Sequence, residues 1–181
     1  MFPLNCVARA GRGVTGNALV SVGIFADLEN LVDLRCSPEQ AQAKTVALLR
    51  VVFRHLLSQR QQPLPPYLLA CVHGFLPNVV RHVLEQHGFD VHITRSTRRD
   101  AAENLLMHKV SRVLDAYGKD TFPRHAVILS GDGRLSLLVQ RLQAVQCHVC
   151  IVGLRRHTSR VLEYMADEFL AVEDLLAVGT I

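Results

Sequence analysis

An apolar run that ends abruptly in acidic residues is the first part of the sequence that could do chemistry. Residues 20–26 read VSVGIFA, and Asp27, Glu29 and Asn30 follow directly. Such a run predicts a buried strand, and in open α/β sheets ligands bind outside the carboxyl ends of the strands. Hard divalent cations take oxygen ligands. The strand end therefore suggests a cation site, although an acidic helix cap or turn would use the same residue types.

A second apolar run, residues 125–129, ends in a similar way in the sequence Ser130-Gly131-Asp132-Gly133. Glycines on both sides of Asp132 would let the backbone turn tightly and leave the carboxylate exposed. If the two predicted strands are neighbours in the sheet, Asp27 and Asp132 face each other, and a cation between them would offset their repulsion. Asp132 could instead cap the helix that follows.

The third such segment is an arginine-rich stretch at the start of a predicted helix. Asp100, Glu103 and Asn104 stand at positions i, i+3 and i+4, so they share one face of that helix. This face could complete a set of oxygen ligands while Arg98 and Arg99 hold phosphates, for which guanidinium groups are suited. The same residues also fit an acidic first helical turn, favoured by the helix dipole, beside a solvated basic loop.

Strand-like and helix-like segments alternate along the chain, which is typical of a parallel α/β sheet. A helix start is marked by Ser37 as the cap and Pro38 at the first helical position. We expect segments 1–18 to be a flexible lead-in and 19–181 to form a single domain. The predicted strands cover residues 19–26, 67–74, 89–94, 125–129 and 147–152, the predicted helices 38–59, 76–86, 100–117, 134–145 and 158–165, and residues 168–178 could add a short strand.

The composition bounds the class of protein. With 181 residues, 49% of them hydrophobic, the chain can bury an ample core. It has 20 Lys and Arg against 16 Asp and Glu, a mild excess that permits an anionic partner without requiring one. Five cysteines, an odd and scattered set, favour a reducing compartment. We see no signal peptide and no apolar run of membrane-spanning length, so we expect a cytoplasmic protein without membrane association.

Other reactive residue types carry weaker signals. Cys147 and Cys150 are spaced so that a strand would point them to opposite faces, which predicts core packing rather than a shared metal. The histidines show no catalytic spacing, although His108 follows Asn104 by one helical turn. Arg155 lies in a basic stretch before a helix, where it could hold a phosphate or simply be solvated.

Taken together, these segments resemble the NYN domain, the LabA-like branch of the PIN-like nuclease superfamily. The family's D-x-x-N motif after an apolar strand is matched by Asp27 and Asn30, and its S-G-D motif by residues 130–132. Asp100 matches the acid that opens the family's middle helix, and residues 159–169 resemble the family's tail. The resemblance covers residues 19–175, nearly the whole chain.

The resemblance implies a PIN-like, Rossmann-like three-layer sandwich with a central, mostly parallel sheet of about five strands flanked by helices. It also implies hydrolysis of RNA at a site that holds Mg²⁺ or Mn²⁺. Asp27, Asp100 and Asp132 carry over as catalytic metal ligands, and Asp167 is a weaker candidate. The family's second acid in the middle helix is Leu106 here, so Glu103 or Asn104 would have to substitute. The expected substrate-binding residues are Asn30, Asn104, Ser130, Arg98, Arg99, Arg134 and Arg155.

One departure from the family pattern bears directly on activity. Arg134 stands where the family has a second acid after S-G-D, and Leu135 replaces an aromatic residue. An arginine near a divalent cation opposes metal binding through like-charge repulsion. The sequence therefore leaves open a weak or reshaped nuclease, a catalytically degenerate RNA-binding or regulatory module, a small-nucleotide binder, and an Arg134 that points outward to a phosphate. Whether the protein forms a homo-oligomer is also left open.

Overall fold

The computed structural model describes residues 20–31, 36–59, 61–74, 77–96, 98, 100–117 and 121–178. The predicted lead-in, residues 1–18, lies outside these ranges, as does Arg99. Of Asn30 the backbone is described but not the side chain.

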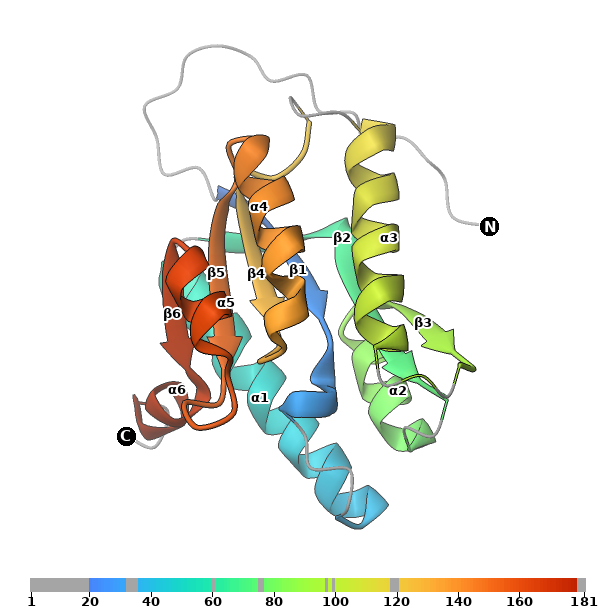
Figure 1. Ribbon diagram of the computed structural model, residues 1–181. Helices are drawn as coiled ribbons and strands as arrows, with labels where there is room; N and C mark the ends of the chain where they lie inside the picture. Colours follow the sequence, from blue (N-terminus) through green and yellow to red (C-terminus); the bar gives the residue numbers. More distant parts are fainter. Residues whose placement is uncertain are drawn as a thin grey trace, which may run out of the picture.

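A six-stranded parallel sheet runs through the middle of the fold, in the order β3-β2-β1-β4-β5-β6 (Figure 1). The predicted α/β class is confirmed, with one strand more than the five expected. The order reverses between β1 and β4, which makes their carboxyl ends the switch point where ligands bind in such sheets. The strands are β1 (Val20–Ala26), β2 (Gln61–His73), β3 (Asp90–Thr94), β4 (His125–Leu129), β5 (His148–Gly153) and β6 (Glu168–Ala171).

Helices cover both faces of the sheet and complete a three-layer sandwich (Figure 1). One face carries α1 (Pro38–Ser58), α2 (Asn78–Gln86) and α6 (Val172–Val178), and the other carries α3 (Ala101–Tyr117), α4 (Ser136–Ala144) and α5 (Arg160–Met165). Two short 3₁₀ helices, η1 (Leu28–Asn30) and η2 (Gly133–Leu135), follow the ends of β1 and β4. The predicted start of α1 is confirmed, because Ser37 and Gln40 form a reciprocal capping box. None of the helices in the described part of the chain combines the length and the hydropathy needed to cross a bilayer.

The hydrophobic core has two layers, one on each face of the sheet, because successive strand residues point to opposite faces. On β1, Ile24 lies in the same buried cluster as Leu49 of α1, whereas Phe25 lies in the cluster of Leu106 from α3. The central strands are buried on both faces, which explains their nearly continuous apolar sequences. The predicted separation of the two cysteines is also confirmed: Cys147 and Cys150 are free thiols packed in opposite core layers.

The largest difference from the predicted elements is the start of β2. The proline-containing segment 61–66 was expected to precede the strand, yet β2 begins at Gln61 and pairs with Val20 of β1. Prolines are tolerated there because β3 pairs only with residues 69–73, which leaves the first half of β2 at an edge. A register shift between Val22 and Ile24 joins the two halves of the pairing. The predicted strand, 67–74, corresponds to the half that leads to the sheet's carboxyl edge.

Two adjacent leucines of α4 offer a direct test of this packing. The side chain of Leu138 is 1% exposed, and that of Leu137 is 62% exposed. We predict that Leu138→Ala lowers the free energy of unfolding by about 2–5 kcal/mol, because it leaves a cavity in the core. Leu137→Ala should change it by less than about 0.5 kcal/mol. Urea unfolding of the two variants measures the difference, and equal losses would contradict the orientation of α4.

Candidate active site at the carboxyl edge of the sheet

Asp27 lies at the centre of the carboxyl edge, directly after β1. Its backbone N–H donates to the carbonyl of Leu129 at 2.9 Å, which extends the β1–β4 pairing by one residue. The side chain is fully buried. Its Oδ2 accepts a hydrogen bond from Ser130 Oγ at 3.0 Å, and its Oδ1 accepts one from the backbone of Glu29 at 3.4 Å. Asp27 is thus held in place by neutral donors.

Asp132 follows the end of β4 and is tied to Asp27 through a serine. The Oγ of Ser130, which donates to Asp27, accepts a hydrogen bond from the Asp132 backbone at 3.1 Å. Asp132 Oδ1 accepts from the backbone of Arg134 at 2.9 Å and so caps η2. Asp27 caps η1 in the same way. Each cap engages a single oxygen of its aspartate, so the capping role and a ligand role are compatible.

The glycines around Asp132 serve close packing, and the Asp132 side chain is only 19% exposed, whereas the sequence predicted an exposed carboxylate. Neither glycine has a positive φ. A Cβ at Gly131 would lie 2.9 Å from the carbonyl oxygen of His157, and one at Gly133 would lie 2.6 Å from Ser159 Oγ. The backbone of Ser159 donates to the Gly131 carbonyl at 2.9 Å. The loop before α5, which includes His157 and Ser159, therefore packs against the segment that carries Asp132 and holds it in place.

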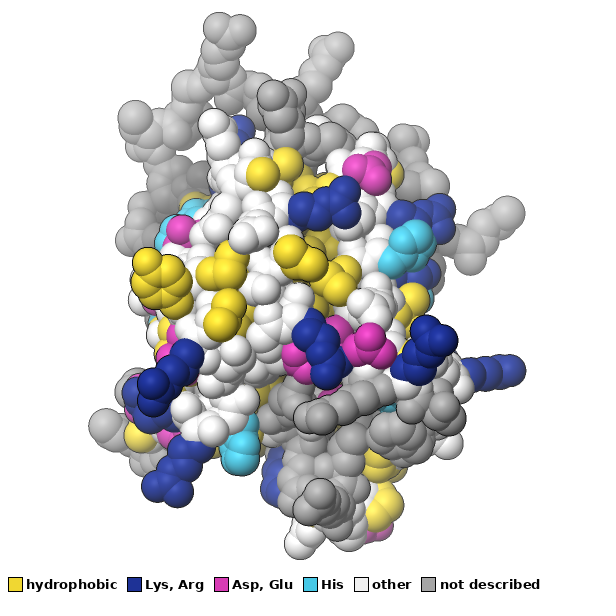
Figure 2. Space-filling view, in the orientation of Figure 1, with side chains coloured by type: hydrophobic (Ala, Val, Ile, Leu, Met, Phe, Trp, Pro, Cys, Tyr) yellow, Lys and Arg dark blue, Asp and Glu magenta, His cyan; other side chains and the backbone are white. Residues whose placement is uncertain are grey.

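Glu103, in the first turn of α3, brings a third carboxylate to this edge. It is 4% exposed, and its Oε2 is buried without a hydrogen-bond partner among the described residues. Its Oε1 lies 3.7 Å from Nη1 of Arg134, whose Nε lies 3.8 Å from Asp132 Oδ1. Arg134 therefore turns toward the acids and not outward. In Figure 2, acidic side chains gather with a basic one against them at the lower middle of the face that carries α3, α4 and α5.

The acids interact electrostatically as a group. Burial raises the pKa of Asp27 to about 7, and the charges of Glu29 and Asp132 act in the same direction against the hydrogen bond from Ser130. Burial also raises the pKa of Glu103 to about 7. The hydrogen bond that protonated Glu103 shares with Asp132, and then the charges of Asp27 and Asp132, act in the same direction. The three carboxylates therefore disfavour being ionised together, and the site favours an added positive charge, from a proton or from a cation.

The remaining predicted residues lie around this cluster or away from it. Asp100 is partly buried, and no hydrogen bond or ion pair of the described residues joins its carboxylate to the three clustered acids. Arg98, Asn104 and His108 are exposed. Arg155 pairs with Asp174 on α6. The Asn30 side chain and Arg99 lie outside the described part of the structure.

Two acids near the predicted motifs have structural partners that the sequence did not reveal. Glu29 Oε1 accepts a hydrogen bond from the backbone of His73 at 2.9 Å, and its Oε2 lies 3.5 Å from His73 Nε2. This contact links the ends of β1 and β2. Asp167 accepts a hydrogen bond from the Val149 backbone at 2.8 Å and so holds the start of β6 against β5. The signal available in the sequence was only that each residue adjoins a strand end.

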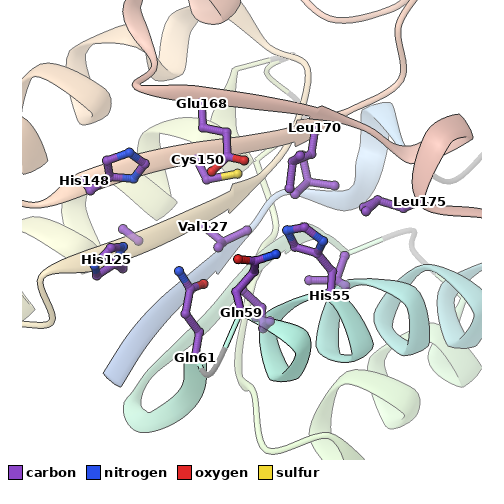
Figure 3. Close-up of a pocket in the computed structure, with 14 residues that line it drawn as sticks. His55, Gln59, Gln61, His125, Val127, His148, Cys150, Glu168, Leu170 and Leu175 are labelled. Carbon is purple, nitrogen blue, oxygen red and sulfur yellow. The ribbon is translucent and has the colours of Figure 1, made fainter. Parts of the chain in front are cut away.

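A separate cavity of about 140 Å³ lies at the opposite, amino edge of the sheet (Figure 3). His125 and His148, the first residues of β4 and β5, lie with their rings 5.4 Å apart. His55 of α1 and Gln59, which directly follows α1, face them across the cavity. Burial, and then His148, lowers the pKa of His125. The sequence did not indicate this group, because the two histidines meet only through strand register. None of the clustered acids lines the cavity.

A parallel α/β sandwich with carboxylates gathered at the switch point is the arrangement of PIN-like nuclease domains. The NYN domain family model matches residues 21–173, and the chain belongs to this family, which is part of the PIN-like superfamily. The fold is similar to the crystal structure of a protein of unknown function from Vibrio parahaemolyticus, with a TM-score of 0.57 and 19% identity over 90% of this chain and 98% of that one. The chain has no match among curated proteins.

The burial of Asp27 predicts a specific pH dependence of stability in the absence of metal. The folded protein holds the Asp27 proton up to about pH 7, whereas the pKa of an unperturbed aspartate is 3.8. Between these values the folded state binds more protons, so the free energy of unfolding falls as pH rises. Asp27→Asn should flatten this fall and be more stable than the wild type at pH 8.

Urea unfolding between pH 4 and pH 8 in a chelator measures this effect. Asp174→Asn is the matched control, because Asp174 is exposed and lies on α6. It should keep the wild-type slope. The same slope in Asp27→Asn as in the wild type would show that Asp27 does not carry the raised pKa.

Proposed function

We propose that this NYN domain is a metal-dependent ribonuclease that binds Mg²⁺ or Mn²⁺ with Asp27, Glu103 and Asp132. The observation that carries the proposal is the buried Oε2 of Glu103: with the acids ionised it has no donor among the described residues, and the carboxylates of Asp27 and Asp132 lie nearby. A buried carboxylate oxygen without a donor is costly, and a cation would remove that cost. Family membership supports the same chemistry.

The donor set fits a hard divalent cation, which prefers carboxylate oxygens. In the described part of the chain, however, no three His, Cys, Asp or Glu side chains stand close enough to hold a metal as they are. Asp27 is fixed by Ser130, so Glu103 and Asp132 are the side chains that would move toward it. Asp100, one residue before α3, would add a ligand from the rim or bind a metal-bound water.

The residues around the cluster have distinct roles in this proposal. The bound cation would activate a water and neutralise charge on the scissile phosphate. Ser130 orients Asp27 and positions the Asp132 backbone, so it supports the ligands and does not contact the substrate. Asp27 and Glu103, whose pKa values lie near 7, would release protons as the cation binds.

RNA binding is assigned to the polar rim near the start of α3. Arg98 and Asn104 are exposed there and are available to phosphates and bases. Arg99 and Asn30 stay sequence-based predictions for the same role. Arg155 is a weaker candidate, because Asp174 already binds its guanidinium group.

A second function, RNA binding without cleavage, is favoured by one observation. Arg134 places a permanent positive charge within 4 Å of both Glu103 and Asp132, at 3.7 and 3.8 Å. If that arginine remains in place, it substitutes for the cation and leaves an RNA-binding surface without hydrolysis. Such binding would persist in a chelator and weaken steeply with salt.

Cleavage of labelled RNA in the presence of Mn²⁺ tests the proposal. We predict cleavage that a chelator abolishes, and losses in Asp27→Asn, Glu103→Gln and Asp132→Asn larger than the roughly 10- to 100-fold that outer-shell metal partners contribute. Asp115→Asn, which removes an exposed carboxylate in the last turns of α3, should cleave like the wild type. Cleavage that survives in Asp27→Asn would exclude the proposed metal site. Intact RNA together with salt-dependent binding in the chelator would favour the second function.

A further inference from the structure

Among the described residues, Arg134 supplies the positive charge that contacts the acidic cluster of Asp27, Glu103 and Asp132. Both of its contacts are long. Its two nitrogens lie 3.7 and 3.8 Å from Glu103 and Asp132, beyond ordinary hydrogen-bond length. Its side chain is 40% exposed, whereas that of Glu103 is 5% exposed. The guanidinium group therefore partly balances the acids from the solvent side and does not satisfy the buried Glu103 Oε2.

We infer that Arg134 is a resident cation which a divalent metal must displace, and that the displaced guanidinium group binds an RNA phosphate, so that metal and RNA bind cooperatively. This inference rests on the proposed metal site. Arg134 then has a role besides its contact with the substrate: it couples the binding of the metal to the binding of the RNA.

The competition follows from charge and space. A cation held by Glu103 and Asp132 would use the carboxylate oxygens that Arg134 faces, and the two positive charges would repel each other at short range. Arg134 can leave without unfolding its surroundings. The hydrogen bond that anchors the residue runs from its backbone to Asp132, and the long side chain lies at the surface.

The coupling to RNA follows from where the displaced side chain ends. The backbone of Arg134 belongs to η2, at the rim of the cluster. Its guanidinium group therefore stays near any phosphate that a bound metal attracts. Guanidinium groups bind phosphates through paired charge-assisted hydrogen bonds. RNA thus stabilises the displaced state that the metal requires. Because coupling between two ligands is reciprocal, RNA must raise metal affinity by the factor by which metal raises RNA affinity.

Calorimetric titration of the full chain with Mn²⁺ tests the coupling without measuring turnover. The titration is done alone and with a saturating phosphorothioate oligoribonucleotide, whose own Mn²⁺ binding is subtracted and whose integrity is checked on a gel. In the wild type, we expect the oligonucleotide to tighten Mn²⁺ binding about tenfold, within the usual range of coupling. Arg134→Ala and Arg134→Gln should bind Mn²⁺ about tenfold more tightly without oligonucleotide and gain less from the oligonucleotide than the wild type does, because only the direct contact between metal and phosphate remains.

Arg81→Ala is the matched control, because it removes an exposed arginine that pairs with Glu85 on α2. It should behave like the wild type. Equal Mn²⁺ affinity in the wild type and both Arg134 variants, with no effect of oligonucleotide, would overturn the coupling and leave the metal site standing. Weaker Mn²⁺ binding in both variants would also overturn it. Absence of Mn²⁺ binding in all proteins would instead overturn the proposed function.

Discussion

The parallel pairing of β1 with β4 is the constraint on which the site depends. It aligns Ala26 with Leu129, and the hydrogen bond from the Asp27 backbone to Leu129 continues it to the strand end. The strand order reverses at this pair, so the two polar segments that follow diverge to opposite sides and leave the edge between them open. Ser130 then spans the gap and fixes Asp27 relative to Asp132.

Burial gives this edge its electrostatic character. Asp27 and Glu103 are removed from water beside other carboxylates, and the pKa of each rises to about 7. Groups in this state are destabilised as anions and gain from any nearby positive charge. Arg134 supplies one positive charge to these acids from the solvent side. A divalent metal would supply two charges at a shorter distance. In our proposal, the balance between these two cations decides whether the domain hydrolyses RNA or only binds it.

The sequence predicted most of the fold because the strands are buried and apolar and the helices are amphipathic. The ends of β4 were predicted to the residue, and the α1 cap was recognised from Ser37 and Pro38. The start of β2 was missed, since prolines argue against a strand and only the limited extent of β3 permits them. The packing role of Gly131 was missed as well, because the loop it contacts is distant in sequence.

The candidate site was predicted in part. Asp27 and Asp132 follow strand ends, so topology alone brings them together. The choice of Glu103 over Asp100 could not be made from spacing, because it depends on the rotation of α3 about its axis. Which way Arg134 points was likewise open, since an exposed arginine has many rotamers and its position is set by the charge around it.

Anomalous scattering from crystals soaked in Mn²⁺ is the most direct test of the central claim. We expect a peak bounded by Asp27, Glu103 and Asp132, with the Arg134 guanidinium group moved away from Glu103. A soaked crystal without a peak among these acids, and with Arg134 still facing Glu103 and Asp132, would contradict it.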